Sequence, residues 1–417
     1  MTDERFDAAE LLARTRGLSG GAELLELAAA RDDVELVGGA VRDLMLDRAP
    51  RELDVVVGEG AGAFAGQLAA RLQATALASE HERFGTALVT WPGGRIDIAT
   101  RRDERYPAPG ALPEVGRGTP EQDLARRDFT VNAIAVALGA THRGRARAVA
   151  HAREDVSRGV LRVLHDKSFR DDPTRLLRLA RYRARLGFEV APATGELARA
   201  AVAAHALDTV SGARAGAELR LALTEEQPLA ALSAIDDLGL LTALHPRLRL
   251  DPDLSARALA LLPGDGRPDL LLLASVGMAL VLRAGGNRGA ELGALLDRLE
   301  FPAGDRDRAV AASLAGASLA EALGGVQSAS ELHAVVGGSP PEGVALAGAQ
   351  ANPGIARRWL EQVRHVRLRI DGSDLLAAGI PQGPDIGRRL DSVLRARLDE
   401  RVPDERGAQL RAALERS

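Results

Sequence analysis

Hydrophobic and polar positions alternate with two different periods along the chain. Within residues 34–100, short apolar runs in which side chains alternate between two faces predict strands, among them LDVVV (53–57), TALVTW (86–91) and RIDIAT (95–100). Residues 7–31 predict two short amphipathic helices that cover one face of the sheet. From about residue 150 the apolar spacing is helical almost to the end. The pattern therefore predicts an α+β fold, in which a small mixed or antiparallel sheet with flanking helices precedes a helical remainder.

The stretch LVGGAVRDLMLDRAPRELDVVV (36–57) predicts a strand, a glycine turn, a short helix, a loop and a second strand. Gly38 and Gly39 lack Cβ atoms, so the backbone can approach a phosphate while N–H groups of the next helix face it. Arg42 opens that helix. Glu52 and Asp54 lie two residues apart on a strand and project from the same face. Two carboxylates beside a phosphate-binding turn indicate a site for divalent cations, and their oxygen atoms favour Mg²⁺.

Asp97 lies in the strand RIDIAT and faces away from Ile96 and Ile98. On a neighbouring strand it would be a third carboxylate that meets Glu52 and Asp54. The alternative is a solvated strand residue without a role in chemistry.

Residues 101–118 are charged and then rich in proline and glycine, which predicts a loop long enough to be functional. The next segment, DLARRDFTVNAIAVAL (123–138), predicts a helix followed by a strand. The basic stretch HRGRARAVAHARED (142–155) closes the first domain near residue 150.

The strongest predicted helix is SFRDDPTRLLRLARYRARLGF, with Asp171 or Asp172 at its N-cap and Gly187 at its end. Its spacing predicts one cationic face, formed by Arg175, Arg178 and Arg181, and one buried face of leucines.

Asp172 and Arg175 place a hydrogen-bond acceptor beside a fork of donors near the start of this helix. Cytosine and adenine both carry an amino donor next to a ring-nitrogen acceptor, so such a pair would accept them and reject guanine and uracil. The alternative is a capped helix with a surface ion pair.

Composition narrows the classes of function. The chain has 417 residues, 54 Lys and Arg against 58 Asp and Glu, and no cysteine. The near balance of charge argues against general coating of nucleic acid, so any RNA contact needs a local basic surface. Disulfides and thiolate chemistry are excluded. The N-terminus lacks the apolar core of a signal peptide, and the longest apolar run, 270–282, is too short for a bilayer. We therefore expect a soluble, cytoplasmic protein without membrane partners.

Five motifs in series resemble the bacterial (class II) tRNA nucleotidyltransferase and poly(A) polymerase family, the CCA-adding enzymes. They are GGAVRD, the acidic-x-acidic strand, DIATRRDERY, RRDFTVNAIA and DDPTRLLRLARYRARLGF, and the match covers roughly residues 34–250. Weaker matches are VSGARAGAELRLAL (210–223) and IDGSDLLAAGIPQGPDIG (370–387). The resemblance implies a nucleotidyltransferase head (1–150), a helical neck with the nucleotide-recognition helix (151–250), and a helical body and tail that hold tRNA (251–417).

The resemblance also implies roles for individual residues. Metal ligands would be Glu52 and Asp54, with Asp97 as a further catalytic candidate, and the nucleotide would be bound by Gly38, Gly39, Arg42, Arg126, Arg127, Asp128, Asn132, Asp172, Arg175, Arg178 and Arg181. The family usually has Asp where this chain has Glu52. Because Glu is also a good oxygen ligand, we expect activity to be retained.

The expected function is Mg²⁺-dependent, template-independent transfer of CMP and AMP from CTP and ATP to the 3′ end of tRNA. CC-only, A-only and poly(A) addition remain open within this class, and segment 101–120 is where such enzymes would differ in specificity. A non-catalytic tRNA-binding protein, with Glu52 as a sign of lost activity, is the alternative of another class. A small-molecule nucleotidyltransferase is disfavoured because it leaves the long helical remainder without a substrate.

Overall fold

The computed structural model describes residues 7–74, 76–81, 85–281 and 289–415. The chain divides into two compact units, Met1–Val210 and Ser211–Ser417. The three-part division with boundaries near residues 150 and 250 stays a prediction.

The first unit contains a mixed sheet. Among the described residues, seven strands form it in the order β3-β4-β5-β2-β1-β8-β9. The pair β2 and β5 is parallel, and each of the other neighbouring pairs is antiparallel. The strands of this unit are β1 (Val34–Val37), β2 (Leu53–Val57), β3 (Ala76–His81), β4 (Thr86–Trp91), β5 (Gly94–Thr100), β6 (Arg102–Arg105), β7 (Glu114–Arg117), β8 (Ile134–Ala137), β9 (Ala146–Ala148), β10 (Val160–Leu161) and β11 (Glu189–Val190).

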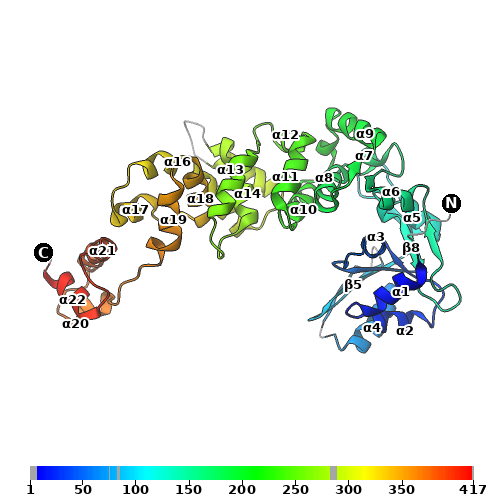
Figure 1. Ribbon diagram of the computed structural model, residues 1–417, viewed down its shortest axis with the longest axis horizontal. Helices are drawn as coiled ribbons and strands as arrows, with labels where there is room; N and C mark the ends of the chain where they lie inside the picture. Colours follow the sequence, from blue (N-terminus) through cyan, green and yellow to red (C-terminus); the bar gives the residue numbers. More distant parts are fainter. Residues whose placement is uncertain (1–6, 75, 82–84, 282–288, 416–417) are drawn as a thin grey trace. The chain divides into compact units, whose positions relative to one another are not determined.

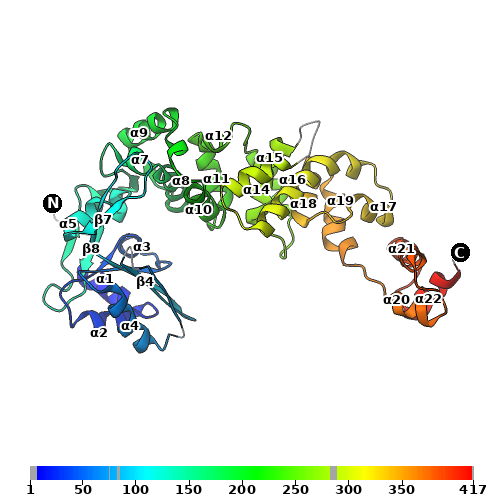
Figure 2. The same cartoon turned by 180° about the vertical axis from the view of Figure 1, so that it is seen from behind.

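Helices pack beside this sheet, as predicted (Figures 1 and 2). Helix α4 contacts β4 and β5, and α2 contacts α4, so α2 lies beside the helix that packs on the sheet. Burial of apolar strand side chains such as Leu36, Val55 and Ile98 supplies the driving force. The helices of this unit are α1 (Ala8–Gly17), α2 (Gly21–Ala28), α3 (Gly39–Met45), α4 (Ala61–Leu72), α5 (Pro120–Ala125), α6 (Ala152–Arg158), α7 (Ser168–Asp171), α8 (Thr174–Leu186) and α9 (Pro192–Ala203), with the 3₁₀ turns η2 (Thr130–Asn132) and η3 (Ala206–Thr209).

The prediction of a loop over residues 101–118 was wrong at both ends of the segment. Strands β6 and β7 pair antiparallel there, with Arg102 opposite Arg117 and Arg105 opposite Glu114. The two strands carry charged side chains, so no apolar alternation marked them. Their stability comes from backbone pairing and from ion pairs of the buried Glu104 carboxylate with Arg102 and Arg126.

The predicted helix after residue 168 is interrupted near its start. The short helix α7 ends at Asp171, and α8 begins at Thr174. The N-cap residue of α8 is Pro173, so the prediction of Asp171 or Asp172 at this position was wrong. The Asp172 side chain instead accepts hydrogen bonds from the Thr174 N–H and hydroxyl, at 3.0 and 2.6 Å. The predicted end of the helix is confirmed, because Gly187 adopts the left-handed conformation with φ of 70°.

The second unit is helical throughout its described residues. The described residues of this unit end at Val281 and resume at Gly289, before α15. Its elements are α10 (Gly212–Leu223), α11 (Pro228–Asp237), α12 (Leu240–Leu244), α13 (Pro252–Leu261), α14 (Pro268–Val281), α15 (Ala290–Arg298), α16 (Ala303–Gly324), α17 (Ala329–Val336), α18 (Pro341–Gln350), α19 (Pro353–Glu361), η4 (Val363–His365), α20 (Gly372–Ala377), α21 (Pro384–Leu398) and α22 (Arg406–Glu415).

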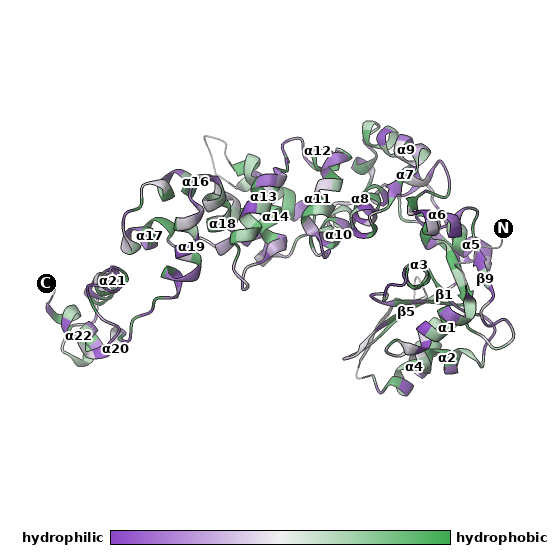
Figure 3. Cartoon of the chain, in the orientation of Figure 1, coloured by the Kyte–Doolittle hydropathy of each residue, from purple (hydrophilic) through white to green (hydrophobic). Residues whose placement is uncertain are grey.

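Helix α14 is apolar around most of its circumference and lies in the core of this unit, where it contacts α16 and α18 (Figure 3). An ion pair between a buried carboxylate and a partly exposed arginine supports this packing. The fully buried Glu342 on α18 accepts hydrogen bonds from Arg308 on α16 at 2.7 and 3.0 Å.

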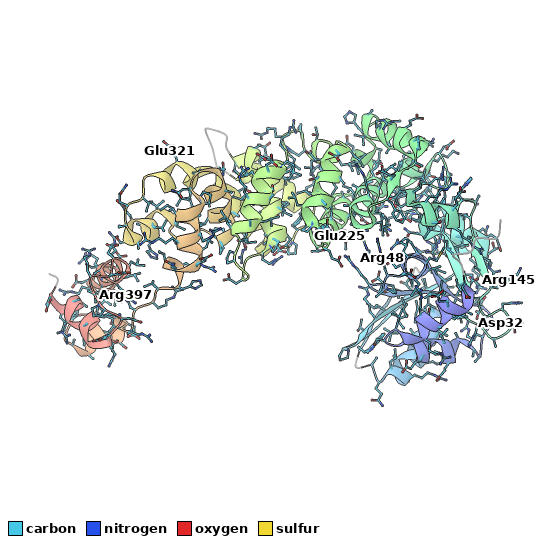
Figure 4. All side chains as sticks on the ribbon, in the orientation of Figure 1. Asp32, Arg48, Arg145, Glu225, Glu321 and Arg397 are labelled. Atoms are coloured by element: carbon cyan, nitrogen blue, oxygen red, sulfur yellow. The ribbon has the colours of Figure 1, made fainter. Side chains whose placement is uncertain are left out.

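The last helices, α20 to α22, share a small core of Ile370, Leu375, Val393 and Ala413. Arg397 on α21, labelled in Figure 4, lies 3.8 Å from Asp404. In the part of the chain that the structure describes, no helix has both the length and the apolar character needed to cross a bilayer.

Candidate active site

Three carboxylates meet where β2 and β5 begin. Parallel pairing places Asp54 beside Asp97, and Glu52 lies just before β2 on the same face as Asp54. One oxygen atom from each of Glu52, Asp54 and Asp97 lies within 4.8 Å of the others. Carboxylate oxygens at this spacing can share a divalent cation, and the donor set fits a hard ion such as Mg²⁺ or Mn²⁺.

Asp54 is the innermost carboxylate of the three. Burial raises its pKa from 3.8 to about 7, and the negative charges of Glu52 and Asp97 add to the rise. The positive charges of Arg127 and Arg42 oppose it. Without a bound cation, the three carboxylates therefore cannot all be ionised without cost near neutral pH.

This raised pKa predicts that affinity for a divalent cation depends on pH. Below about pH 7 the cation must displace a proton from Asp54, so we expect affinity to rise up to about tenfold per unit from pH 6 to pH 7 and to level off by about pH 8. The folding stability that comes from protonation of Asp54 decreases, rather than increases, as pH rises. It is fully present below the unfolded pKa near 3.8 and is lost as pH rises through about 7. Calorimetric Mn²⁺ titration at each pH checks the first trend, and Asp54→Asn should abolish it.

Arg95 joins two of the carboxylates, and sequence reasoning did not identify it. Its Nε lies 3.1 Å from Glu52 Oε2, and its Nη2 lies 2.6 Å from Asp97 Oδ2. Its position two residues before Asp97 on β5, on the same strand face, was the only available signal.

The glycine turn between β1 and α3 lies next to the carboxylates. Gly38 has φ of 69°, and a Cβ there would come within 2.8 Å of Arg127 Nη1 and 3.5 Å of Asp54 Oδ2. A Cβ on Gly39 would lie 3.4 Å from Arg42 Nη2. The turn thus lets two guanidinium groups and a carboxylate approach the backbone closely. The Gly38 N–H itself donates to the Ile134 carbonyl at 3.1 Å, so the sheet already uses this donor.

A chain of buried hydrogen bonds connects three of the sequence motifs. Arg178 on α8 donates to Asp128 Oδ2 from Nε at 2.9 Å and from Nη2 at 2.7 Å. The other oxygen of Asp128 accepts from Asn132 Nδ2 at 2.9 Å, and Asn132 Oδ1 accepts from Arg42 Nη1. Arg42 also binds Asp43 Oδ1, at 2.7 and 2.8 Å. We call this series, Arg178–Asp128–Asn132–Arg42, the buried relay.

Electrostatics hold Asp128 ionised within the buried relay. Burial alone would raise its pKa, but the charge of Arg178 and hydrogen bonds from Asn132 and Arg178 lower the pKa to about 2. Asp128 therefore remains a carboxylate acceptor throughout the neutral range.

The arginines of α8 do not form the solvent-facing cationic surface that their spacing predicted. Arg175 and Arg181 are buried, and Arg178 is mostly buried. Arg175 donates to Ser168 Oγ and to the Arg126 carbonyl, both at 2.8 Å. Arg181 lies 5.0 Å from the ring centre of Tyr182. The prediction failed because two of the acceptors, Asp128 for Arg178 and the Arg126 carbonyl for Arg175, come from a distant segment of the chain.

Arg126 and Arg127 are held by an acidic residue that sequence reasoning missed. Asp123 accepts from Arg126 Nη2 at 2.8 Å and from Arg127 Nη2 at 3.1 Å. Spacings of three and four residues on a helix were the available signal. Arg126 also binds Glu104 on β6 at 3.0 Å, which ties the β6–β7 hairpin to this segment.

Comparisons with known proteins agree with this arrangement. Residues 34–162 match the family described as the poly A polymerase head domain. The chain is 34% identical over 402 residues to the A-adding tRNA nucleotidyltransferase of Geobacter sulfurreducens, covering 91% of this chain and 45% of that protein. It is 40% identical to the CC-adding tRNA nucleotidyltransferase of Deinococcus radiodurans, over 51% of this chain and 55% of that one. The chain thus spans about half the length of the curated relatives it matches.

Solved structures show the same fold. The Thermotoga maritima CCA-adding enzyme complexed with tRNA matches with a TM-score of 0.77 and 27% identity, over 98% of each chain. A CCA-adding enzyme in an apo form matches with a TM-score of 0.79 and 27% identity, over 99% of this chain and 96% of that one. These matches confirm the predicted α+β head with a helical remainder and the family resemblance. Residues 34–162 are therefore similar to the poly A polymerase head domain.

Proposed function

We propose that this protein is an RNA nucleotidyltransferase that adds CMP and AMP, from CTP and ATP, to the 3′ end of tRNA without a template. The observation that carries the proposal is the cluster of Glu52, Asp54 and Asp97, whose oxygens approach within 4.8 Å beside the Gly38–Gly39 turn. Support also comes from relatives named as A-adding, CC-adding and multifunctional CCA enzymes.

The three carboxylates are the proposed ligands of Mg²⁺. When bound, divalent ions polarise the attacking hydroxyl and neutralise charge on the departing pyrophosphate. In this proposal, Asp54 and Glu52 hold the ion, and Asp97 completes the acidic cluster across the strand pair. Arg127 and the Gly39 backbone are the proposed phosphate ligands, whereas Gly38, whose N–H already donates to the Ile134 carbonyl, provides space, since Arg127 Nη1 lies within 2.8 Å of the Cβ position that Gly38 leaves open.

The remaining arginines have indirect roles in this proposal. Arg42 is only 1% exposed, and its guanidinium group donates to Asn132 and Asp43. In this proposal it fixes the position of the Gly38–Gly39 turn and does not contact the nucleotide. Arg178 fixes Asp128 and Asn132 in the same way, and Arg181 packs beside Tyr182. Arg126 links the β6–β7 hairpin to the segment that follows.

Asp172 and Arg175 are the proposed base-reading pair. For this role, the Arg175 guanidinium must exchange at least part of its bonding to Ser168 Oγ and the Arg126 carbonyl for the base. The bond to the Arg126 carbonyl connects base reading to the segment that contains Arg127.

We expect Arg175→Ala to loosen base choice while leaving metal binding intact. Losing the guanidinium removes the donors that pair with cytosine and adenine, so incorporation of G or U should rise about tenfold relative to C or A. Single-turnover extension with each nucleoside triphosphate measures this ratio, and Asp172→Ala should act in the same direction. If both variants incorporate G and U no more often than the parent, Asp172 and Arg175 do not read the base.

The decisive experiment supplies purified protein with tRNA lacking its terminal nucleotides, together with Mg²⁺ and CTP, ATP or both. Addition of all three nucleotides supports the proposal. A product extended only by A, on tRNA that already ends in CC, supports the second candidate, an A-adding enzyme. That candidate is favoured by the A-adding relative whose match covers 91% of this chain. Binding of tRNA without extension supports the non-catalytic alternative.

A further inference from the structure

Arg95 lies on the solvent side of the acidic cluster and bridges two strands. Parallel pairing sets Leu53 beside Ile96, so the preceding residues, Glu52 and Arg95, are also neighbours. Arg95 contacts Glu52 at 3.1 Å and Asp97 at 2.6 Å. Its side chain is 48% exposed.

The two contacts are made to two of the three carboxylates that form the acidic cluster. A guanidinium group carries a full positive charge and donates through several N–H groups at fixed angles. An oxygen that accepts a charge-assisted hydrogen bond is a weaker ligand, because its negative charge is already partly compensated. Arg95 and a divalent cation thus compete for Glu52 and Asp97.

We propose that Arg95 is a positioning residue that acts as a resident counterion. It holds Glu52 and Asp97 together before the metal binds, and it withdraws from them when the metal takes their oxygens. This inference rests on the proposed function only in assuming that the cluster binds a divalent cation. Its consequence is a metal affinity that is set lower than the three carboxylates alone would give.

The test is direct titration of the full-length protein with Mn²⁺, followed by electron paramagnetic resonance, without RNA or nucleotide. Asp54→Ala identifies the signal that belongs to the cluster. Arg95→Gln should bind Mn²⁺ about tenfold more tightly than the parent, because the competing charge is gone. Arg95→Lys keeps that charge and should stay within about twofold of the parent.

Arg267 offers a matched control in the other unit. Its Nη2 lies 2.6 Å from Asp269 Oδ2, two residues along the chain, and its side chain is 44% exposed. Arg267→Gln should leave the Mn²⁺ affinity unchanged. The metal-free unfolding temperature of Arg95→Gln should fall, and the rise on adding Mn²⁺ should exceed that of the parent.

Three results would overturn the inference. Equal or weaker Mn²⁺ binding by Arg95→Gln would mean that Arg95 does not compete with the metal. Tight binding by Arg95→Lys, equal to that of Arg95→Gln, would mean that the charge is not responsible. A tighter affinity in Arg267→Gln would mean that any loss of surface charge has the same effect. If Asp54→Ala loses no Mn²⁺ site, the metal-dependent proposed function fails instead.

Discussion

Replacement of Asp54 by alanine is expected to reduce the rate of nucleotide addition about a thousandfold, which corresponds to about 4 kcal/mol of transition-state stabilisation. Asp54 is the innermost of three carboxylates whose oxygens lie within 4.8 Å, and its raised pKa reflects its burial first and then the negative charges of its neighbours. Without the Asp54 carboxylate, only Glu52 and Asp97 remain, and both of them contact Arg95. Single-turnover extension at saturating Mg²⁺ measures the loss.

The control for this experiment is Glu59→Ala. Glu59 follows β2 closely, but its side chain is 70% exposed and pairs with Arg117 at the surface. It should retain the rate of the parent. Extension by Asp54→Ala at an undiminished rate would favour the non-catalytic reading of the cluster, whereas Glu52→Asp should stay active because both residues supply a carboxylate oxygen.

Asp128→Ala is expected to destabilise the first unit by about 3 kcal/mol and to slow nucleotide addition about a hundredfold. The change removes the carboxylate to which Arg178 and Asn132 donate. Asn132 would then no longer be fixed where it accepts from Arg42. Urea unfolding gives the first quantity, and single-turnover extension well below the unfolding temperature gives the second.

Glu342→Ala separates the two effects. Glu342 is also fully buried and paired with an arginine, but it lies in the second unit. It should lose comparable stability and keep the rate of the chemical step. A similar loss of rate in both variants would mean that the buried relay acts only through overall stability.

Local signals predicted the parts of the fold that depend on neighbouring residues. The alternation of strand side chains placed Asp54 and Asp97 on definite faces, and Gly187 marked the end of a helix. The register that sets Asp54 beside Asp97 could not be predicted from the sequence. Parallel pairing of β2 and β5 depends on how the intervening elements α4, β3 and β4 pack.

Charged residues limited what the pattern revealed. Arg178 read as a surface arginine because its partner, Asp128, lies 50 residues earlier in the chain. The β6–β7 hairpin read as a loop because its strands bury little apolar surface. Arg95 was not identified because exposed arginines are common on strands. Its role became evident only when the structure placed it beside Glu52 and Asp97. The motifs therefore indicated that Glu52, Asp54 and Asp97 lie together, whereas the hydrogen-bond partners of the arginines became evident only in the structure.

The parallel pairing of β2 and β5 also affects when the acidic cluster can form during synthesis. Strand β2 can pair with β5, which ends at Thr100, only after α4, β3 and β4 have been synthesised. Domains fold as the N-terminal part of the nascent chain becomes available, and contacts between distant residues form slowly. A nascent chain that stops before Asp97 thus carries Glu52 and Asp54 without their third partner, and should bind divalent ions only weakly.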